Sequence, residues 1–390
     1  MAIDSRWQHS AGHGARSKRV TASPVGTGRA FLRATLIIGL SGLLAAVAAC
    51  GGTGAPTPSL AASPAQSKAQ ASSAGTGASP APASSAPAAG KPAEQAAPSL
   101  RAAYVALSGS FLPLWLADAT KAFPAHQVAV NMQYIQAGTA TTALIAGDVD
   151  LLEESAATLL TADLNGHSDL VFLASALNHA QFSLYVAPAI QTAADLKGKV
   201  LAVDRPGTAV DYGMRVLLSK LGLKPTDVTL RPLGNTSVEY PALLAGQVDG
   251  AVMAPPFTFM AKAKGFRELQ NIYDVPYQNV GVMARRSHLN ELAPALPGFL
   301  AAYRDGIRAY NEQPDLATKV IQEYTKETDP DILRQTYEFY RTTAPFQTDL
   351  QPTLGGIKAM LDFLSDTIPA AKTAAPEQFV DLRFLSQMPA

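Results

Sequence analysis

One phrase of the sequence occurs twice, and it constrains the fold more than any other feature. Ala143–Asp150 reads ALIAGDVD, and Ala242–Asp249 reads ALLAGQVD. In each copy an apolar helical turn meets a glycine, which permits the left-handed cap that ends a helix, and the chain then enters an apolar strand. The repetition predicts two α/β halves of like construction, although any α/β protein can use this device.

Alternating strand and helix patterns surround both copies of the phrase. In the first half we expect strands at 100–107, 127–134, 149–152 and 170–176, with helices at 111–122, 139–146 and 156–165. In the second half we expect strands at 200–203, 228–232 and 250–253, with helices at 209–220, 238–245 and 257–264, and further helices over 296–390. Strands that alternate with helices predict parallel, doubly wound sheets.

A secretory signal precedes the α/β region. Residues 1–33 are polar and basic, an apolar run spans Ala34–Ala49, and Cys50 follows two alanines. A basic segment, an apolar segment and small residues before a cut site are the parts of such a signal. The end of the run resembles the lipobox of bacterial lipoproteins, which implies a lipid on Cys50. An uncleaved membrane anchor and a buried cysteine in a core helix are the alternatives.

The segment after Cys50 has the composition of a tether. Residues 51–98 are almost entirely Ala, Pro, Ser, Gly, Thr and Gln, and Leu60 is their only large apolar residue. Such a segment cannot bury enough apolar surface to offset the entropy lost on ordering. We therefore expect a signal peptide at 1–49 and a disordered linker at 50–98, with the folded region starting at 99.

Composition excludes several functions. The 390 residues carry a formal net charge of +0, and Lys and Arg form no stripe of the kind that binds nucleic acid. One cysteine allows neither an internal disulfide nor a multi-cysteine metal site. The six histidines show no metal-binding spacing, so we expect no metal and no cofactor.

The chain resembles a known family of solute-binding proteins. Four pieces carry the resemblance, namely Asp195–Lys199, Pro206–Thr208, Leu243–Asp249 and Pro255–Phe257. They are similar to segments of the ABC-transporter binding proteins of the nitrate, sulfonate, taurine and thiamine-pyrimidine-precursor class. The same resemblance extends over Leu100–Asn178.

The resemblance implies an α/β fold of the type II periplasmic-binding-protein kind, with two doubly wound lobes joined by two hinge crossings. Lobe one comprises 99–184 and 281–390, and lobe two comprises 185–280. Two short apolar or β-prone runs, Phe182–Val186 and Asn279–Met283, are the expected crossings. A ligand would lie in the cleft between the lobes.

Ligands of open α/β sheets bind beyond the carboxyl ends of the strands, beside helix N-termini. The family uses the corresponding loops, so both arguments select the same places. The candidate ligand-binding residues in these loops are Ser108, Ser110, Phe111, Gly138, Thr139, Glu154, Ser155, Asn178, Thr208, Asp211, Asn235, Glu239, Pro255 and Phe257.

Several of these residues have an equally plain structural interpretation. Thr208 and Asp211 have the spacing of a capping box, and Thr139 fits an N-cap. Of Glu153 and Glu154, one is expected to be solvated. Trp115 fits either a core residue or a stacking platform. The acids of the expected cleft, Glu154 among them, favour a polar or nitrogen-bearing ligand over a plain inorganic anion.

We expect a non-enzymatic, solute-binding component of an ABC importer, which captures a small polar nitrogen- or sulfur-containing organic solute. It would be a monomer that is lipid-anchored at the outer face of the cytoplasmic membrane and delivers the solute to a membrane permease. A ligand-sensing adaptor lipoprotein is the alternative. An enzyme on the same fold is a further one, but pyrimidine synthase relatives carry a cysteine-rich motif, and the only cysteine here is Cys50.

Overall fold

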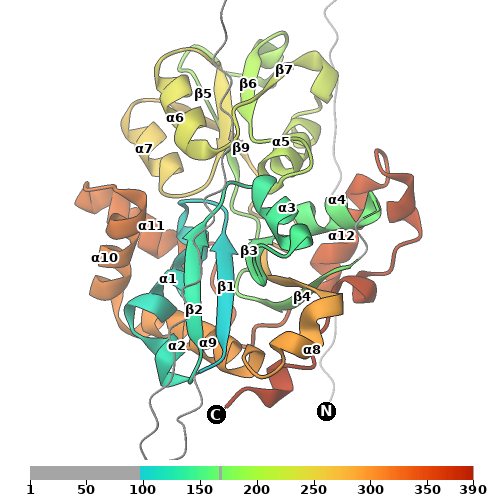
Figure 1. Cartoon of the computed structure of the whole chain (residues 1–390). Coiled ribbons are helices and arrows are strands. Elements are labelled where there is room, and N and C mark those ends of the chain that lie inside the picture. Colours follow the sequence, from blue (N-terminus) through green and yellow to red (C-terminus); the bar gives the residue numbers. More distant parts are fainter. Residues whose placement is uncertain (1–96, 167–168, 390) are drawn as a thin grey trace, which may run out of the picture. The chain divides into compact units, whose positions relative to one another are not determined.

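The computed structural model describes residues 97–166 and 169–389. The expected signal peptide, Cys50 and nearly all of the expected linker therefore lie outside the described residues. All described residues belong to one compact unit of the chain. They form two five-stranded sheets with helices packed around them (Figure 1).

The first sheet has the strand order β2-β1-β3-β10-β4. Its strands are β1 (Ser99–Tyr104), β2 (Ala129–Tyr134), β3 (Leu151–Ser155), β4 (Leu170–Ser175) and β10 (Val280–Arg285). The second sheet has the order β7-β6-β8-β5-β9. Its strands are β5 (Ser183–Val186), β6 (Val200–Val203), β7 (Thr229–Pro232), β8 (Gly250–Met253) and β9 (Arg267–Asn271).

The two sheets share one topology. In each, the first three strands pair in the spatial order second, first, third, and a strand from the other part of the chain separates the third strand from the fourth. That inserted strand is β10 in the first sheet and β5 in the second, and both run antiparallel to their neighbours. The sheets are therefore doubly wound and mostly parallel as expected, with antiparallel pairing added where the two crossing segments become strands of the sheets.

The duplicated phrase occupies equivalent places in the two sheets. The first copy ends α3 (Thr139–Ala146) and leads to β3, and the second ends α6 (Thr236–Leu244) and leads to β8. Gly147 has φ +85° and Gly246 has φ +68°, so both glycines adopt the left-handed conformation that the sequence predicted.

The remaining helices cover the sheets. In the first part of the chain these are α1 (Leu112–Ala119), α2 (Ala122–Ala125) and α4 (Ala156–Leu164). Next come α5 (Ala209–Lys220), α7 (Phe257–Ala263) and α8 (Leu289–Leu292). The C-terminal part contains α9 (Leu296–Glu312), α10 (Pro314–Thr325), α11 (Pro330–Thr342) and α12 (Leu354–Leu364), which pack around the first sheet (Figure 1).

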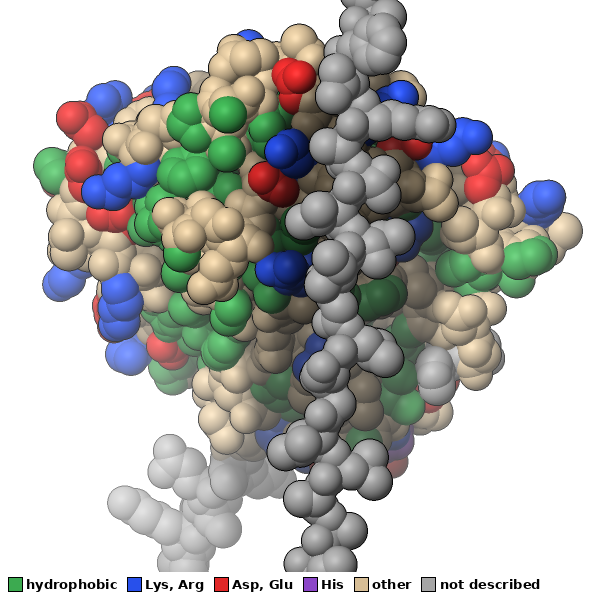
Figure 2. Space-filling view, turned by 90° about the horizontal axis from the view of Figure 1, so that it is seen from above, with side chains coloured by type: hydrophobic (Ala, Val, Ile, Leu, Met, Phe, Trp, Pro, Cys, Tyr) green, Lys and Arg blue, Asp and Glu red, His purple; other side chains and the backbone are tan. Residues whose placement is uncertain are grey.

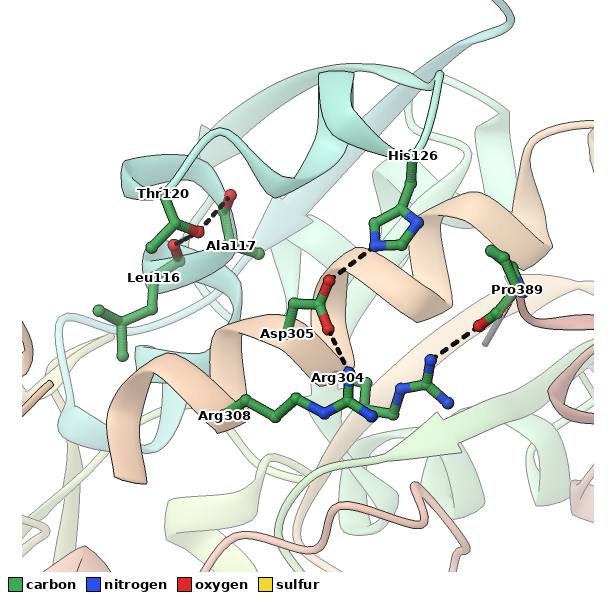
Figure 3. Close-up of polar contacts among 8 residues, drawn as sticks. All are labelled: Leu116, Ala117, Thr120, His126, Arg304, Asp305, Arg308 and Pro389. Carbon is green, nitrogen blue, oxygen red and sulfur yellow. Dashed lines mark hydrogen bonds and ion pairs between the residues drawn. The ribbon is translucent and has the colours of Figure 1, made fainter. Parts of the chain in front are cut away.

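Helix α9 is the centre of the helical layer beside the first sheet. A Cβ atom at Gly306 would lie 1.9 Å from the carbonyl oxygen of Pro113, so α9 and α1 touch backbone to backbone at this point. On the outer side, Asp305 accepts a hydrogen bond from His126 Nε2 at 2.7 Å and pairs with Arg308 (Figure 3). These contacts fix α9 against the segment that precedes β2.

Acidic and basic side chains are interspersed over the surface. On the face seen in Figure 2, Lys, Arg, Asp and Glu alternate around the rim, and the visible part shows no broad area of one sign. Within 97–166 and 169–389, no helix is long and apolar enough to cross a membrane.

Candidate functional site

A cavity lies between the two sheets, and residues from both of them line it. Its volume open to water-sized molecules is about 60 Å³. The turn after β1 contributes Ser108, Ser110 and Phe111, the end of β3 contributes Glu154 and Ser155, and the second sheet contributes residues after β6, before α6 and after β8. Gln181 and Phe182 before β5, Asn279 before β10 and Val280 at the start of β10 complete the wall.

The turn after β1 is held by a hydroxyl cluster. Ser108 Oγ lies 3.0 Å from Ser110 Oγ and 3.3 Å from the hydroxyl of Tyr340, which comes from α11. The Tyr340 hydroxyl also donates to Gln181 Oε1 at 2.5 Å. This chain of contacts ties the turn to the segment that leads into β5 and positions Phe111 at the cavity.

Glu154 lies at the end of β3 with almost no exposed surface. Its Oε1 accepts a hydrogen bond from the Ser155 amide at 2.9 Å, and the side chain of Thr158 is a further hydrogen-bond partner of the carboxyl. Burial raises the pKa of Glu154 to about 8. The Ser155 hydroxyl is 2.9 Å from that of Tyr277, so a neutral hydrogen-bonded pair lies beside this carboxyl.

A second carboxyl faces the cavity from the other sheet. Asp204 follows β6, and its carboxyl is in contact with that of Glu239, which lies in the first turn of α6. Burial raises the pKa of Asp204 to about 6 and the pKa of Glu239 well above its usual range, and the contact between the two carboxyls adds to the rise for Glu239. Two carboxyls in contact without a cation share a proton.

Asn279 supplies a third oxygen acceptor. Its Nδ2 donates to the carbonyl of His179 at 2.8 Å, and this bond fixes the orientation of the amide. Its Oδ1 is buried and has no hydrogen-bond partner within the described part of the chain. The cavity wall therefore combines the two buried carboxyls of Glu154 and Asp204 with the amide oxygen of Asn279, which has no donor among the described residues.

Six of the sequence-predicted site residues line this cavity, namely Ser108, Ser110, Phe111, Glu154, Ser155 and Asn235. Phe257 lines a smaller adjoining cavity of about 20 Å³ together with Ser108 and Asn235. Glu239 lies behind Asp204 rather than at the cavity surface.

The structure does not bring the other predicted residues into the cavity. Gly138 and Thr208 line a shallow groove on the outer side, and the Thr139 hydroxyl accepts a hydrogen bond from Arg205 at 3.2 Å. Asn178 binds the backbone carbonyl of Gln351. The Pro255 carbonyl accepts a hydrogen bond from the Gly109 amide at 3.2 Å, so that residue closes the edge of the site through its backbone.

Asp211 serves its own helix. Its Oδ2 accepts hydrogen bonds from the Gly207 amide at 3.0 Å and from Arg215 Nε at 3.1 Å, and its amide donates to Thr208 Oγ1. Of the two interpretations of the Thr208–Asp211 spacing, these bonds agree with the structural one, in which the two residues cap a helix. Asp211 faces a separate outer groove of about 500 Å³ between α5 and α12.

The burial of the Glu153, Glu154 and Trp115 side chains tests two further expectations. We expected one of Glu153 and Glu154 to be solvated, and this is wrong, because β3 extends to Ser155 and both side chains are 3% exposed. Glu153 instead accepts a hydrogen bond from the Tyr303 hydroxyl on α9, on the other face of the sheet. Trp115 is a core residue, stacked on Tyr324 with ring centroids 4.2 Å apart.

Sequence reasoning missed Asp204, Asn279, Gln181 and Phe182. Asp204 lies four residues before the candidate Thr208. Phe182 and Asn279 begin the two expected crossings and Gln181 directly precedes the first, and we interpreted these segments as hinges and not as ligand contacts. The signal in the sequence that could have identified Gln181 and Asn279 was a polar residue at the start of an apolar crossing segment. Within the residues that the structure describes, no group of three or more His, Cys, Asp or Glu side chains is arranged to hold a metal ion.

Residues 110–317, more than half of the chain, match the model of the NMT1/THI5-like family. The chain belongs to that family, and the class of protein expected from the sequence is confirmed. No curated protein sequence is significantly similar to this chain.

Solved structures show the same fold at low sequence identity. The alkanesulfonate-binding protein SsuA from Xanthomonas axonopodis pv. citri, bound to MOPS, is 20% identical, with 74% of this chain and 99% of that chain covered and a TM-score of 0.63. A Candida albicans protein described as having the generic periplasmic binding protein fold is 18% identical, with coverages of 73% and 96% and a TM-score of 0.60. The chain thus has the periplasmic binding protein fold.

An enzyme shares this fold as well. The desulfurization enzyme DszB is 14% identical, with coverages of 74% and 98% and a TM-score of 0.54. One of its structures is a cysteine-to-serine mutant in complex with biphenyl-2-sulfinic acid. The fold alone therefore does not separate binding from catalysis.

Proposed function

We propose that this protein is the extracytoplasmic solute-binding component of an ABC importer. The observation that carries the proposal is the cavity between the two sheets, with walls from both of them and buried polar side chains in those walls. Membership of the NMT1/THI5-like family supports it. The solute is a small polar organic molecule that contains nitrogen or sulfur.

The two-sided cavity suits capture by closure. We take 99–184 and 281–390, with most of the first sheet and the C-terminal helices, as lobe one and 185–280, with most of the second sheet, as lobe two, so that the boundaries fall within the crossing strands β5 and β10. A solute that contacts both lobes binds the closed arrangement better than an open one and shifts the population toward it. The Arg205–Thr139 and Gly109–Pro255 hydrogen bonds join the lobes at the edge of the cavity and favour the closed arrangement.

Anchoring is the second part of the proposal. Cys50 would carry a lipid that holds the protein, as a monomer, at the outer face of the cytoplasmic membrane, and the linker would let the folded region reach its permease. A diacylglycerol supplies the two chains that stable anchoring requires. The sequence pattern at 34–50 supports this step.

Binding is favoured over catalysis that uses a thiol. The only cysteine of the chain is Cys50, so no cysteine side chain lines the cavity among the described residues. A ligand-sensing adaptor would use the same cavity, and it differs from an importer only in its membrane partner.

A thermal-shift measurement with small sulfonates, amines, pyrimidines and oxyanions tests the proposal. Because a ligand that binds only the native state stabilises it by RT ln(1 + [L]/Kd), a true solute raises the unfolding temperature in a concentration-dependent way. Solute uptake by cells with and without the gene then separates an importer from a sensor. A solute that binds tightly and whose uptake is unchanged by loss of the gene would contradict the importer role.

A further inference from the structure

We propose that the cavity selects a small cation or N–H-donating group, such as an amidine, a guanidine or an amine, and discriminates against oxyanions and sulfonates. This inference rests on the proposed solute-binding function and names the ligand class for the same site. It is carried by the chemistry of the cavity wall.

The first observation is a set of buried acceptors that have no cationic partner. Asn279 Oδ1 has no hydrogen-bond partner among the described residues, the carboxyls of Glu154 and Asp204 have no cation beside them there, and all three side chains are at least nine-tenths buried. The three residues line one cavity. A buried acceptor without a partner is costly, so a ligand that donates to all three relieves that cost.

The Asn279 amide is independent of the acids. A neutral amide can present either its oxygen or its nitrogen to a ligand. Here the nitrogen is engaged with the His179 carbonyl at 2.8 Å, so the oxygen is the atom left over for the cavity. A ligand group that contacts Asn279 Oδ1 must therefore donate a hydrogen bond, whatever the charge state of the carboxyls.

The second observation is charge. Of the described residues, no Lys, Arg or His lines the cavity, while Glu154 and Asp204 do. An anionic ligand would enter a wall that contains two carboxyls and no balancing cation. A cationic ligand would pair with those carboxyls, which is what makes a buried carboxylate favourable.

Helix N-termini around the cavity are the strongest argument for an anion, since their free amides favour negative charge. In this protein each of these helix N-termini already has a side-chain hydrogen-bond acceptor. Ser155, Thr208 and Asn235 each accept a hydrogen bond from the first turn of the helix that they cap. Asp211 and Glu239 also place a carboxyl in the first turns of α5 and α6.

The size and the aromatic side chains of the cavity agree with a small cationic group. Phe111 and Phe182 form apolar parts of the wall, and an aromatic face attracts a cation. A volume of about 60 Å³ accommodates a group of a few non-hydrogen atoms.

The protonation state of the wall provides a direct signature. Burial raises the pKa of Glu154 to about 8 and that of Asp204 to about 6. The titratable groups that face these carboxyls are Glu239, Asp211, Tyr134 and Tyr277. A cation that binds near pH 6.5 favours the ionised carboxyls and releases protons, whereas an anion favours their protonated forms.

Isothermal titration calorimetry of the full chain with two isosteric pairs of probes tests this inference. Guanidinium and nitrate are both flat and three-fold symmetric, and acetamidinium and acetate share one outline, so charge is the main difference within each pair. We expect each cation to bind at least about tenfold more tightly than its anionic counterpart, because bonds to charged groups are the strong ones. Titrations at pH 6.5 in two buffers of different ionisation enthalpy should show proton release on cation binding, and this readout needs no variant.

Glu154→Gln should weaken both cations by about tenfold or more at pH 8, because it removes the charge that pairs with them. Glu153→Gln is the matched control, since Glu153 is the adjacent buried carboxyl and faces Tyr303 instead of the cavity. Anions that bind as tightly as their cationic counterparts, or no binding by either cation up to 100 mM, would overturn the inference. A sulfonate or other solute found in the thermal-shift panel would in that case leave the proposed solute-binding function standing.

Discussion

Glu154 at the end of β3 and Asp204 after β6 belong to different sheets, yet their carboxyls face the same buried cavity. Asp204 lies close enough to raise the pKa of Glu154, in addition to the larger effect of burial. Bringing the two sheets together thus places two like charges at one site. A donor or cation from the solute is what makes that arrangement favourable.

The stability of the ligand-free protein should fall as pH rises from about 4.5 to about 8. Burial raises the pKa of Glu154 to about 8 from the ordinary 4.5, so in this window the native protein holds a proton that the unfolded chain has lost. The stability that this proton confers is complete below the unfolded pKa and is lost as pH rises through the folded one.

Glu154→Gln isolates this contribution. The variant should match the wild type near pH 5 and exceed it at pH 8 by roughly 2–4 kcal/mol, since one pKa unit corresponds to about 1.4 kcal/mol. Urea unfolding at both pH values provides the measurement. Parallel pH profiles for the two proteins would show that Glu154 ionises normally.

The contact between Gly306 and Pro113 should make one glycine irreplaceable. Gly306→Ala places a methyl group 1.9 Å from the Pro113 carbonyl oxygen, so α9 and α1 must separate. We expect a loss of roughly 1–3 kcal/mol in the free energy of unfolding, as for other overpacked sites. Gly355→Ala, whose Cβ would lie 3.8 Å from its nearest neighbour, is the control and should cost nothing. Equal stability of the two variants would contradict the packing described for α9.

The Arg205–Thr139 hydrogen bond should favour the closed arrangement. Arg205→Ala removes this bond, and we expect the Kd of the solute to rise about two- to fivefold, because an exposed hydrogen bond contributes modestly. Arg231→Ala is the matched control, since Arg231 bonds the Gln247 carbonyl within its own part of the protein. Calorimetric titration of both variants is the measurement. An unchanged Kd for Arg205→Ala would show that this bond does not favour the closed arrangement.

Replacement of Cys50 should release the protein from the membrane. Cys50→Ser cannot be lipidated, so the protein should appear in the soluble fraction or remain unprocessed. Membrane fractionation with immunodetection shows which occurs. Equal processing and equal membrane retention of the variant would rule out the proposed lipid anchor.

Much of the fold could be predicted because it depends on local pattern. The helix–glycine–strand phrase at Gly147 and Gly246 predicted two equivalent strand entries, and β6, β8 and α5 begin and end where we expected. Strand direction could not be predicted, since an apolar run reads alike in a parallel and an antiparallel strand. Strand β9, with the sequence RELQN, is too polar to be recognised without its partner β5.

The site was predicted less completely because it depends on the meeting of distant segments. Asp204 and Asn279 are 75 residues apart, and only the two-sheet assembly places them in one cavity. The capping-box spacing indicated a structural role for Asp211, which serves its own helix, but no local pattern marked Asp204 as the residue that faces the cavity.

Small-angle scattering of the fragment from Pro87 to Ala390, with and without the solute identified by thermal shift, tests the central claim most directly. Capture between the two sheets requires the lobes to approach on binding, so the radius of gyration should decrease at saturating solute. Glu154→Gln should need about tenfold more solute, or more, for the same decrease at pH 8. A tightly bound solute that leaves the radius of gyration unchanged would contradict capture by closure.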